Sequence, residues 1–134
     1  MAHAHDHAPI LAAAVQQYKG LFAESRQSMY IYVDDGNKAC NERFAELLGY
    51  ANPAAWAAVK QSFPAAFVHP DSQDDLIGAF QQAMEDGAGA VLPLTWKRKD
   101  GQSVDSDVIL VPVDVAGHRI AVHYIEPVEG DEEE

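Results

Sequence analysis

Three histidines near the start of the chain, His3, His5 and His7, occupy alternate positions. In an extended segment, alternate side chains project to the same side, so these imidazoles could share a transition metal such as Ni or Cu. The sequence supplies no further ligand and no scaffold beside them. A leader without fixed structure, or an expression artefact, is the simpler explanation, and metal binding is the weaker alternative.

Nucleophiles and paired carboxylates are also present, but their surroundings do not favour catalysis. Serine, histidine and aspartate occur without a strained nucleophile turn, metal-ligand spacing or a phosphate-cradling glycine loop. The aspartate pairs at positions 34–35 and 74–75 fall where a turn and a helix start are expected. We therefore predict that the chain is not an enzyme.

The composition excludes several classes of protein. The length of 134 residues suits one domain, and 48% of the residues are hydrophobic. With a formal net charge of -12 and nine basic residues, the chain is not expected to neutralise the phosphates of a nucleic acid. No window approaches the roughly 20 apolar residues of a membrane span, and residues 1–9 lack the features of a signal peptide. A soluble, cytoplasmic protein is predicted.

Residues 9–25 are predicted to form an amphipathic helix with Pro9 in its first turn. Its apolar side chains recur at steps of three and four residues and form one stripe. The stripe needs a partner, which is either the sheet of the same domain or the same helix of a second copy. The predicted dimer interface consists of Ile10, Leu11, Ala14, Val15, Tyr18, Leu21 and Phe22.

The clearest local signals lie in residues 28–50. A strand over residues 28–33 is apolar on both faces, which predicts that other elements cover both. Residues 34–37, Asp-Asp-Gly-Asn, form a turn, and residues 38–40 form the return strand. Asn41 is then expected to cap a short helix that carries Phe44 and Leu48 and stops at Gly49.

The rest of the chain completes an α+β pattern. A short helix begins at Pro53, and a longer one, capped by Asp71 or Ser72, covers residues 72–85. Strands follow at residues 90–99, 103–113 and 119–125, the first two joined by an Asp-Gly hairpin turn. The resulting order ββαααβββ predicts a five-stranded antiparallel sheet with its helices on one face, preceded by the amphipathic N-terminal helix.

This order resembles the PAS family, and three local motifs support the resemblance. The first is Asp35-Gly36, then Asn41, Phe44 and the segment from Leu47 to Tyr50. The others are His-Pro-Asp at residues 69–71 and Lys-Asp-Gly at residues 99–101. By the order and spacing of these motifs, the resemblance extends over roughly residues 18–128. The resemblance implies a sensory and interaction module with a small internal cavity, dimerising through the helix ahead of the first strand. Because most members are joined to an output domain, the chain is either a stand-alone module or a fragment.

Two cofactors of the family are not expected here. A flavin photosensor of the light-oxygen-voltage kind needs a reactive cysteine after the second short helix, and residues 59–68 contain none. Cys40, at a strand end, is interpreted as a packing residue. A haem protein needs an axial ligand on or near the long helix, whereas His69 precedes Pro70 and His123 is interpreted as a sheet-face residue. The cofactor therefore stays unknown.

Strand alternation predicts which side chains point towards the helical side of the sheet. They either fill the core or leave a cavity for a small apolar or aromatic ligand, and Trp56, Trp96 and Tyr124 could stack on it or make a polar contact. The predicted pocket residues are Met29, Ile31, Val33, Phe44, Leu48, Trp56, Phe67, Phe80, Leu94, Trp96, Leu110, Val122 and Tyr124.

The predicted organisation is a His-bearing leader (1–8), an amphipathic helix (9–25), a PAS domain (26–128) and an acidic tail (129–134). The predicted function is a sensory and protein-interaction module in signal transduction. It acts as a homodimer with a signalling partner or a fused output domain, and its output passes through the N-terminal helix. The alternative is a ligand-free dimerisation domain with a closed core.

Overall fold

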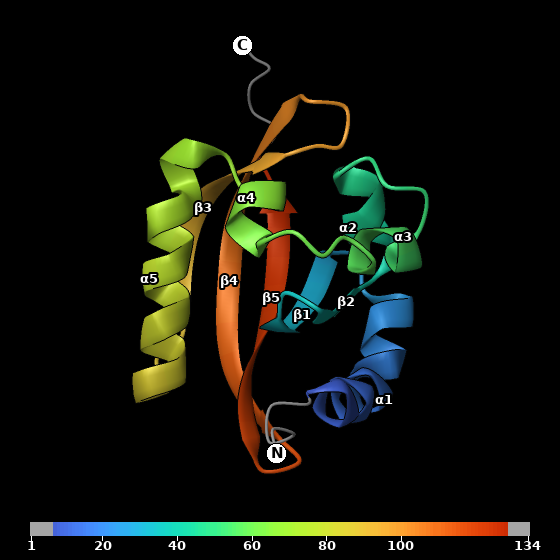
Figure 1. Ribbon diagram of the computed structural model, residues 1–134, viewed down its shortest axis with the longest axis vertical. Coiled ribbons are helices and arrows are strands. Elements are labelled where there is room, and N and C mark those ends of the chain that lie inside the picture. The colour runs from blue at the N-terminus through green and yellow to red at the C-terminus, as the bar shows by residue number, and fades with distance from the viewer. Residues whose placement is uncertain (1–6, 129–134) are drawn as a thin grey trace.

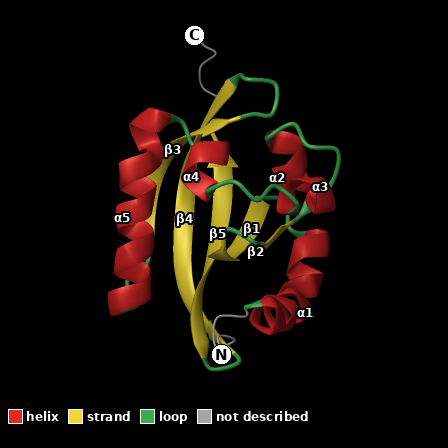
Figure 2. Ribbon diagram, viewed as in Figure 1, coloured by secondary structure: helices red, strands yellow, loops and turns green. Residues whose placement is uncertain are grey.

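The computed structural model describes residues 7–128 and contains one five-stranded antiparallel sheet in the order β2-β1-β5-β4-β3 (Figure 2). The strands are β1 (Ser28–Asp34), β2 (Asn37–Cys40), β3 (Ala90–Lys97), β4 (Ser103–Val115) and β5 (His118–Pro127). The helices are α1 (Ala8–Glu24), α2 (Glu42–Leu47), α3 (Pro53–Ala57), α4 (Phe63–Phe67) and α5 (Pro70–Asp86). The predicted fold class and the five strands are confirmed.

Two details of the helices differ from the predictions. Helix α4, five residues long with a proline in its first turn, was not predicted, because so short an element has no periodicity to recognise. Helix α5 begins at Pro70, and its cap is His69, whose Nδ1 accepts a hydrogen bond from the Asp71 amide at 3.1 Å. Ser72, predicted as a cap, instead accepts a hydrogen bond from the Thr95 amide at 3.0 Å and joins α5 to β3.

The sheet has two covered faces. Helices α2 to α5 pack on the inner face, where α5 runs alongside β3 and α4 lies in front of the central strands (Figure 1). Helix α1 packs on the other, outer face, where its buried Ile10 and Ala14 meet Met29 and Ile31. Of the two partners predicted for the α1 stripe, the structure therefore provides the sheet of its own domain.

In β1 and β5, the side chains predicted to face the helices lie on the outer face, and the alternate side chains lie on the inner face. Tyr30 and Tyr32 of β1 point to the inner face, with His123 of β5 stacked on Tyr30. The predicted inward orientation is wrong for Met29, Ile31, Val33, Val122 and Tyr124, which pack with α1 on the outer face. Since both faces of β1 are covered and apolar, its sequence pattern could not decide the parity.

Asn41 fixes the start of α2 as predicted. Its Oδ1 accepts hydrogen bonds from the Phe44 amide and the Met29 amide, both at 3.1 Å, and its Nδ2 donates to the Gln27 carbonyl at 2.9 Å. One buried side chain thus caps the helix and ties it to β1. No helix among residues 7–128 is both long enough and apolar enough to cross a membrane.

Candidate functional site

A pocket of about 280 Å³ lies between the inner face of the sheet and helices α4 and α5. The strands contribute Tyr30, Tyr32 and His123 to its wall. The helices contribute Phe63, Pro64, Leu76, Ile77, Phe80 and Gln81. The wall is therefore mostly apolar and aromatic, and none of these nine residues is acidic, lysine or arginine. Ile77 and Gln81 are exposed, so the pocket opens along α5.

Tyr30 and His123 contribute buried polar groups to the wall, in addition to the Tyr32 hydroxyl and the exposed Gln81 amide. They are direct register partners of β1 and β5, and their rings stack with centroids 4.0 Å apart and planes inclined by 8°. Tyr30 is 1% and His123 2% exposed. Neither the Tyr30 hydroxyl nor His123 Nδ1 has a hydrogen-bond partner among the described residues. Buried polar atoms are almost always paired, so two such atoms on residues that line one pocket point to a binding site. Both atoms have almost no accessible surface, so a ligand reaches them when a neighbouring side chain moves aside.

Burial keeps both groups uncharged. Desolvation lowers the pKa of His123 from 6.5 to about 3, and the nearby backbone of Tyr30 opposes this shift only in part. Burial also raises the pKa of Tyr30, and the neighbouring Tyr32 adds to this shift. Near neutral pH the site therefore offers a phenol hydroxyl and a neutral imidazole, which together can donate and accept hydrogen bonds.

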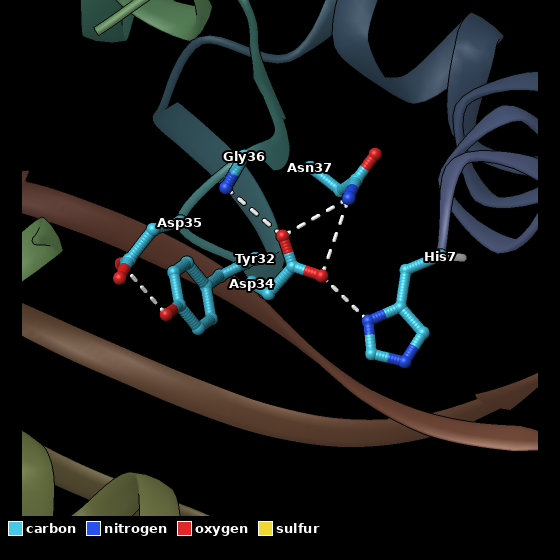
Figure 3. A network of polar contacts seen from close by, with 6 residues as sticks. All are labelled: His7, Tyr32, Asp34, Asp35, Gly36 and Asn37. Carbon is cyan, nitrogen blue, oxygen red and sulfur yellow. Dashed lines mark hydrogen bonds and ion pairs between the residues drawn. The ribbon is translucent and has the colours of Figure 1, made fainter. Parts of the chain in front are cut away.

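The turn between β1 and β2 joins the pocket wall to α1. Asp35 Oδ1 accepts hydrogen bonds from the Tyr32 hydroxyl and from the Phe63 amide, both at 2.9 Å. The adjacent Asp34 points the other way, and its Oδ2 lies 2.5 Å from Nδ1 of His7, the N-cap residue of α1 (Figure 3). Two successive carboxylates thus hold the pocket on one side and the N-terminal helix on the other.

Asp34 is itself well supported. Its Oδ1 accepts hydrogen bonds from the Gly36 amide at 2.9 Å and from Asn37 Nδ2 at 3.0 Å, both drawn in Figure 3. Partial burial by itself raises the pKa of Asp34, but the hydrogen bonds from His7, Asn37 and Gly36 bring it below its usual value of 3.8. The carboxylate is therefore ionised at neutral pH.

A buried lysine lies in the inner core, outside the pocket wall. Lys38 Nζ donates to the carbonyl oxygens of Val59 at 2.5 Å and Asp35 at 2.7 Å, and it lies 5.5 Å from the ring centre of Trp56. Burial lowers its pKa, opposed mainly by Asp35. The ammonium group is satisfied by backbone carbonyls, so we assign Lys38 a structural role: it ties β2 to the segment after α3.

The predicted pocket residues are only partly brought together. Phe80 lines the pocket, while the other residues on the inner face form the core behind it: Phe44, Leu48, Trp56, Phe67, Leu94, Trp96 and Leu110. The five residues of the outer face lie on the far side of the sheet. The sequence analysis did not predict Tyr30 and Tyr32 as pocket residues, because it assigned the other set of alternating β1 side chains to the inner face.

The other residues considered for chemistry are placed as follows. Cys40 is buried, and burial raises its pKa to about 12, so the thiol is protonated and unreactive at neutral pH. His3 and His5 lie outside the described residues, and His7 contacts Asp34. Within residues 7–128, no three or more His, Cys, Asp or Glu side chains are grouped to hold a metal ion.

The sequence matches no protein-family model and no curated protein. Among solved structures, the chain is similar to a PAS domain from Colwellia psychrerythraea, with 16% identity and a TM-score of 0.65 over 86% of this chain and 97% of that chain. It is also similar to a PAS domain, in complex with ethanol, of a LuxR-family transcriptional regulator from Burkholderia thailandensis. The identity is 17% and the TM-score 0.61, over 84% of this chain and 98% of that chain. A third similar structure is a light-oxygen-voltage domain, with 17% identity and a TM-score of 0.64 over 90% of each chain. At these identities the likeness concerns the fold.

Proposed function

We propose that this chain, whose fold is that of a PAS domain, is a sensory and protein-interaction module in signal transduction. It binds a small, mostly apolar ligand in the pocket lined by Tyr30 and His123 and passes the binding event to α1. One observation carries the proposal: two of the residues that line a mostly apolar pocket each carry a buried polar atom without a partner among the described residues. The proposal includes no catalytic role.

The solved structures that this fold resembles favour a signalling role. They include a sensory box histidine kinase and response regulator and a LuxR-family transcriptional regulator. One of these PAS domains was solved in complex with ethanol, a small uncharged molecule. By analogy, the present chain acts on a signalling partner or on an output domain to which it is joined.

The route from the pocket to α1 runs through the two aspartates of the β1–β2 turn. A ligand against Tyr32 or Phe63 displaces the groups that donate hydrogen bonds to Asp35. Asp34 is the residue immediately before Asp35, and it contacts His7 at the start of α1. A change of the turn therefore alters how firmly the N-terminal end of the helix is held.

The output is a shift of α1 between a docked and a released state. When docked, α1 buries Ile10 and Ala14 on the outer face of its own sheet. The predicted dimer stripe contains these same residues, so docking and dimerisation through the stripe compete. Release of α1 exposes the stripe to a second copy of the chain or to a signalling partner.

Native mass spectrometry of the full chain as purified tests ligand binding. We expect extra mass on the folded protein that is lost on denaturation. Ile77→Trp, which fills the mouth of the pocket, reduces this mass, whereas Leu21→Trp, at an exposed position of α1, does not. A folded protein without extra mass that still self-associates through α1 would instead be the ligand-free dimerisation domain.

Hydrogen exchange tests the output. Phenol, used as a small ligand at saturating concentration, is expected to speed exchange of the α1 amides in the wild-type chain. Asp35→Ala removes the acceptor shared by Tyr32 and Phe63, so phenol should still bind without changing exchange in α1. Equal exchange in α1 with and without bound phenol in the wild-type chain would reject this route.

A further inference from the structure

We propose that the pocket selects small uncharged molecules that are mostly apolar and carry one hydroxyl or carbonyl oxygen, which the Tyr30 hydroxyl and His123 Nδ1 bind by hydrogen bonds. This inference rests on the proposed function in one respect, namely that the pocket is a ligand site. It adds the chemical class of the ligand and the two side chains that select it.

The charge of the wall excludes ionic ligands. None of the nine lining residues is acidic, lysine or arginine, and the pKa of the buried His123 is far below neutral. Two charged side chains close to the wall are already engaged: Asp35 with Tyr32 and Phe63, and Lys38 with backbone carbonyls. A carboxylate or an ammonium group in the pocket would lose its hydration without gaining a counter-charge, which is strongly unfavourable.

The two unpartnered atoms define what the ligand must carry. A phenol hydroxyl donates one hydrogen bond and accepts others, and the Nδ1 of a neutral imidazole donates or accepts according to its tautomer. A ligand hydroxyl can accept from Tyr30 and donate to His123, while a carbonyl oxygen can accept from both. A hydrocarbon of the same shape would leave both buried atoms unpaired, so it should bind more weakly.

The size and shape of the pocket restrict the apolar part of the ligand. A volume of about 280 Å³ lies just below the usual range for pockets that bind drug-sized ligands, so a single ring or a short chain suits it better than a flavin or a haem. Tyr32 meets Phe63 and Phe80 edge to face, each at a centroid distance of 5.2 Å. These aromatic walls favour an aromatic ring as the apolar part.

Four one-ring probes test the inference at pH 7 by NMR titration of the labelled full chain. The probes are phenol, toluene, benzoate and benzylamine. We expect phenol to bind roughly ten- to hundredfold more tightly than toluene, the range given by two neutral hydrogen bonds. Benzoate and benzylamine should give no saturable shifts. The inference is overturned if either ion binds as tightly as phenol, or if toluene does.

Variants identify the residues responsible. Tyr30→Phe and His123→Phe each keep the stacked ring and should weaken phenol binding roughly three- to tenfold while leaving toluene binding unchanged. Tyr50→Phe removes a hydroxyl outside the pocket and is the matched control. Equal phenol affinity in the wild-type chain and both pocket variants overturns the assignment. Using two different substitutions guards against a variant that fails to fold.

The outcomes separate this inference from the proposed function. Tight binding of an ion refutes the ligand class and leaves a sensory pocket in place. Phenol binding that depends on Tyr30 but leaves α1 unchanged supports the ligand class and refutes the proposed output. Absence of saturable binding by all four probes refutes both the ligand class and the pocket.

Discussion

The ring of Tyr30 lies flat against the ring of His123, with 4.0 Å between the centroids and 8° between the planes. The stack joins β1 to β5 at the inner face, and its two residues, each with an unpaired buried polar atom, line a mostly apolar pocket. Unpaired buried polar groups are unfavourable for stability. A third such atom, Trp56 Nε1, lies in the core outside the pocket lining, whereas the other two belong to stacked residues of the lining. We therefore interpret the pair as a binding feature.

His123 makes the stability of the domain depend on pH. Its pKa is about 3 in the folded chain and near 6.5 when unfolded, so between these values the unfolded state binds a proton that the folded state does not. The free energy of unfolding is therefore not reduced by His123 above pH 6.5, and it decreases as the pH falls below this value. We expect this effect to lower the free energy of unfolding by about 2 kcal/mol between pH 7 and pH 5, as measured by urea denaturation.

Two variants test whether His123 causes this decrease in stability. In His123→Phe the decrease between pH 7 and pH 5 should be smaller by about the same amount. His118→Gln, which changes an exposed imidazole, should retain the wild-type decrease. An unchanged decrease in His123→Phe would show that His123 is not the group that titrates.

Asp34 is expected to hold the N-terminal end of α1. Asp34→Asn replaces the carboxylate that contacts His7, so exchange of the first α1 amides should speed up by roughly two- to fivefold, the range for a partly exposed polar contact. Because the pKa of Asp34 is lowered, its contribution is present above pH 3.8 and lost as the pH falls further. Asp107→Asn, an exposed position on β4, is the control, and equal effects of both variants would argue against the contact.

Asn41 is expected to matter far more than an ordinary helix cap. Asn41→Ala removes the cap of α2 and leaves the buried Met29 amide without its acceptor, which should lower the free energy of unfolding by about 2 to 4 kcal/mol. Asn52→Ala removes only the exposed cap of α3, which should lower it by about 1 kcal/mol. Similar losses for both variants, measured by urea denaturation, would refute the special role of Asn41.

The fold could be predicted because its signals are local. The Asp-Gly-Asn turn, the Asn41 cap and the hairpin at Asp100-Gly101 each act within a few residues, and their order is that of the PAS family. The neighbouring solved structures confirm this fold. The local sequence predicted Asn41 as the cap of α2, and the structure adds that the same side chain binds the Met29 amide of β1.

The pocket could not be predicted, because it depends on which face of β1 points inward. Met29, Ile31 and Val33 suit a core as well as Tyr30 and Tyr32 do, and only the packing of α1 on the outer face decides between the sets. His123 was correctly interpreted as a sheet-face residue, but its stack on Tyr30 follows from the β1–β5 register. Such a register joins segments more than 90 residues apart and has no local signature.

The most direct test of the account is Tyr30→Phe, measured both for stability and for phenol binding. The substitution removes a buried hydroxyl without a partner among the described residues, so the empty variant should be as stable as the wild-type chain or up to about 1 kcal/mol more stable. Its affinity for phenol should nevertheless fall roughly three- to tenfold. A variant that is less stable than the wild-type chain and binds phenol equally well would contradict the account, since Tyr30 would then serve the core alone.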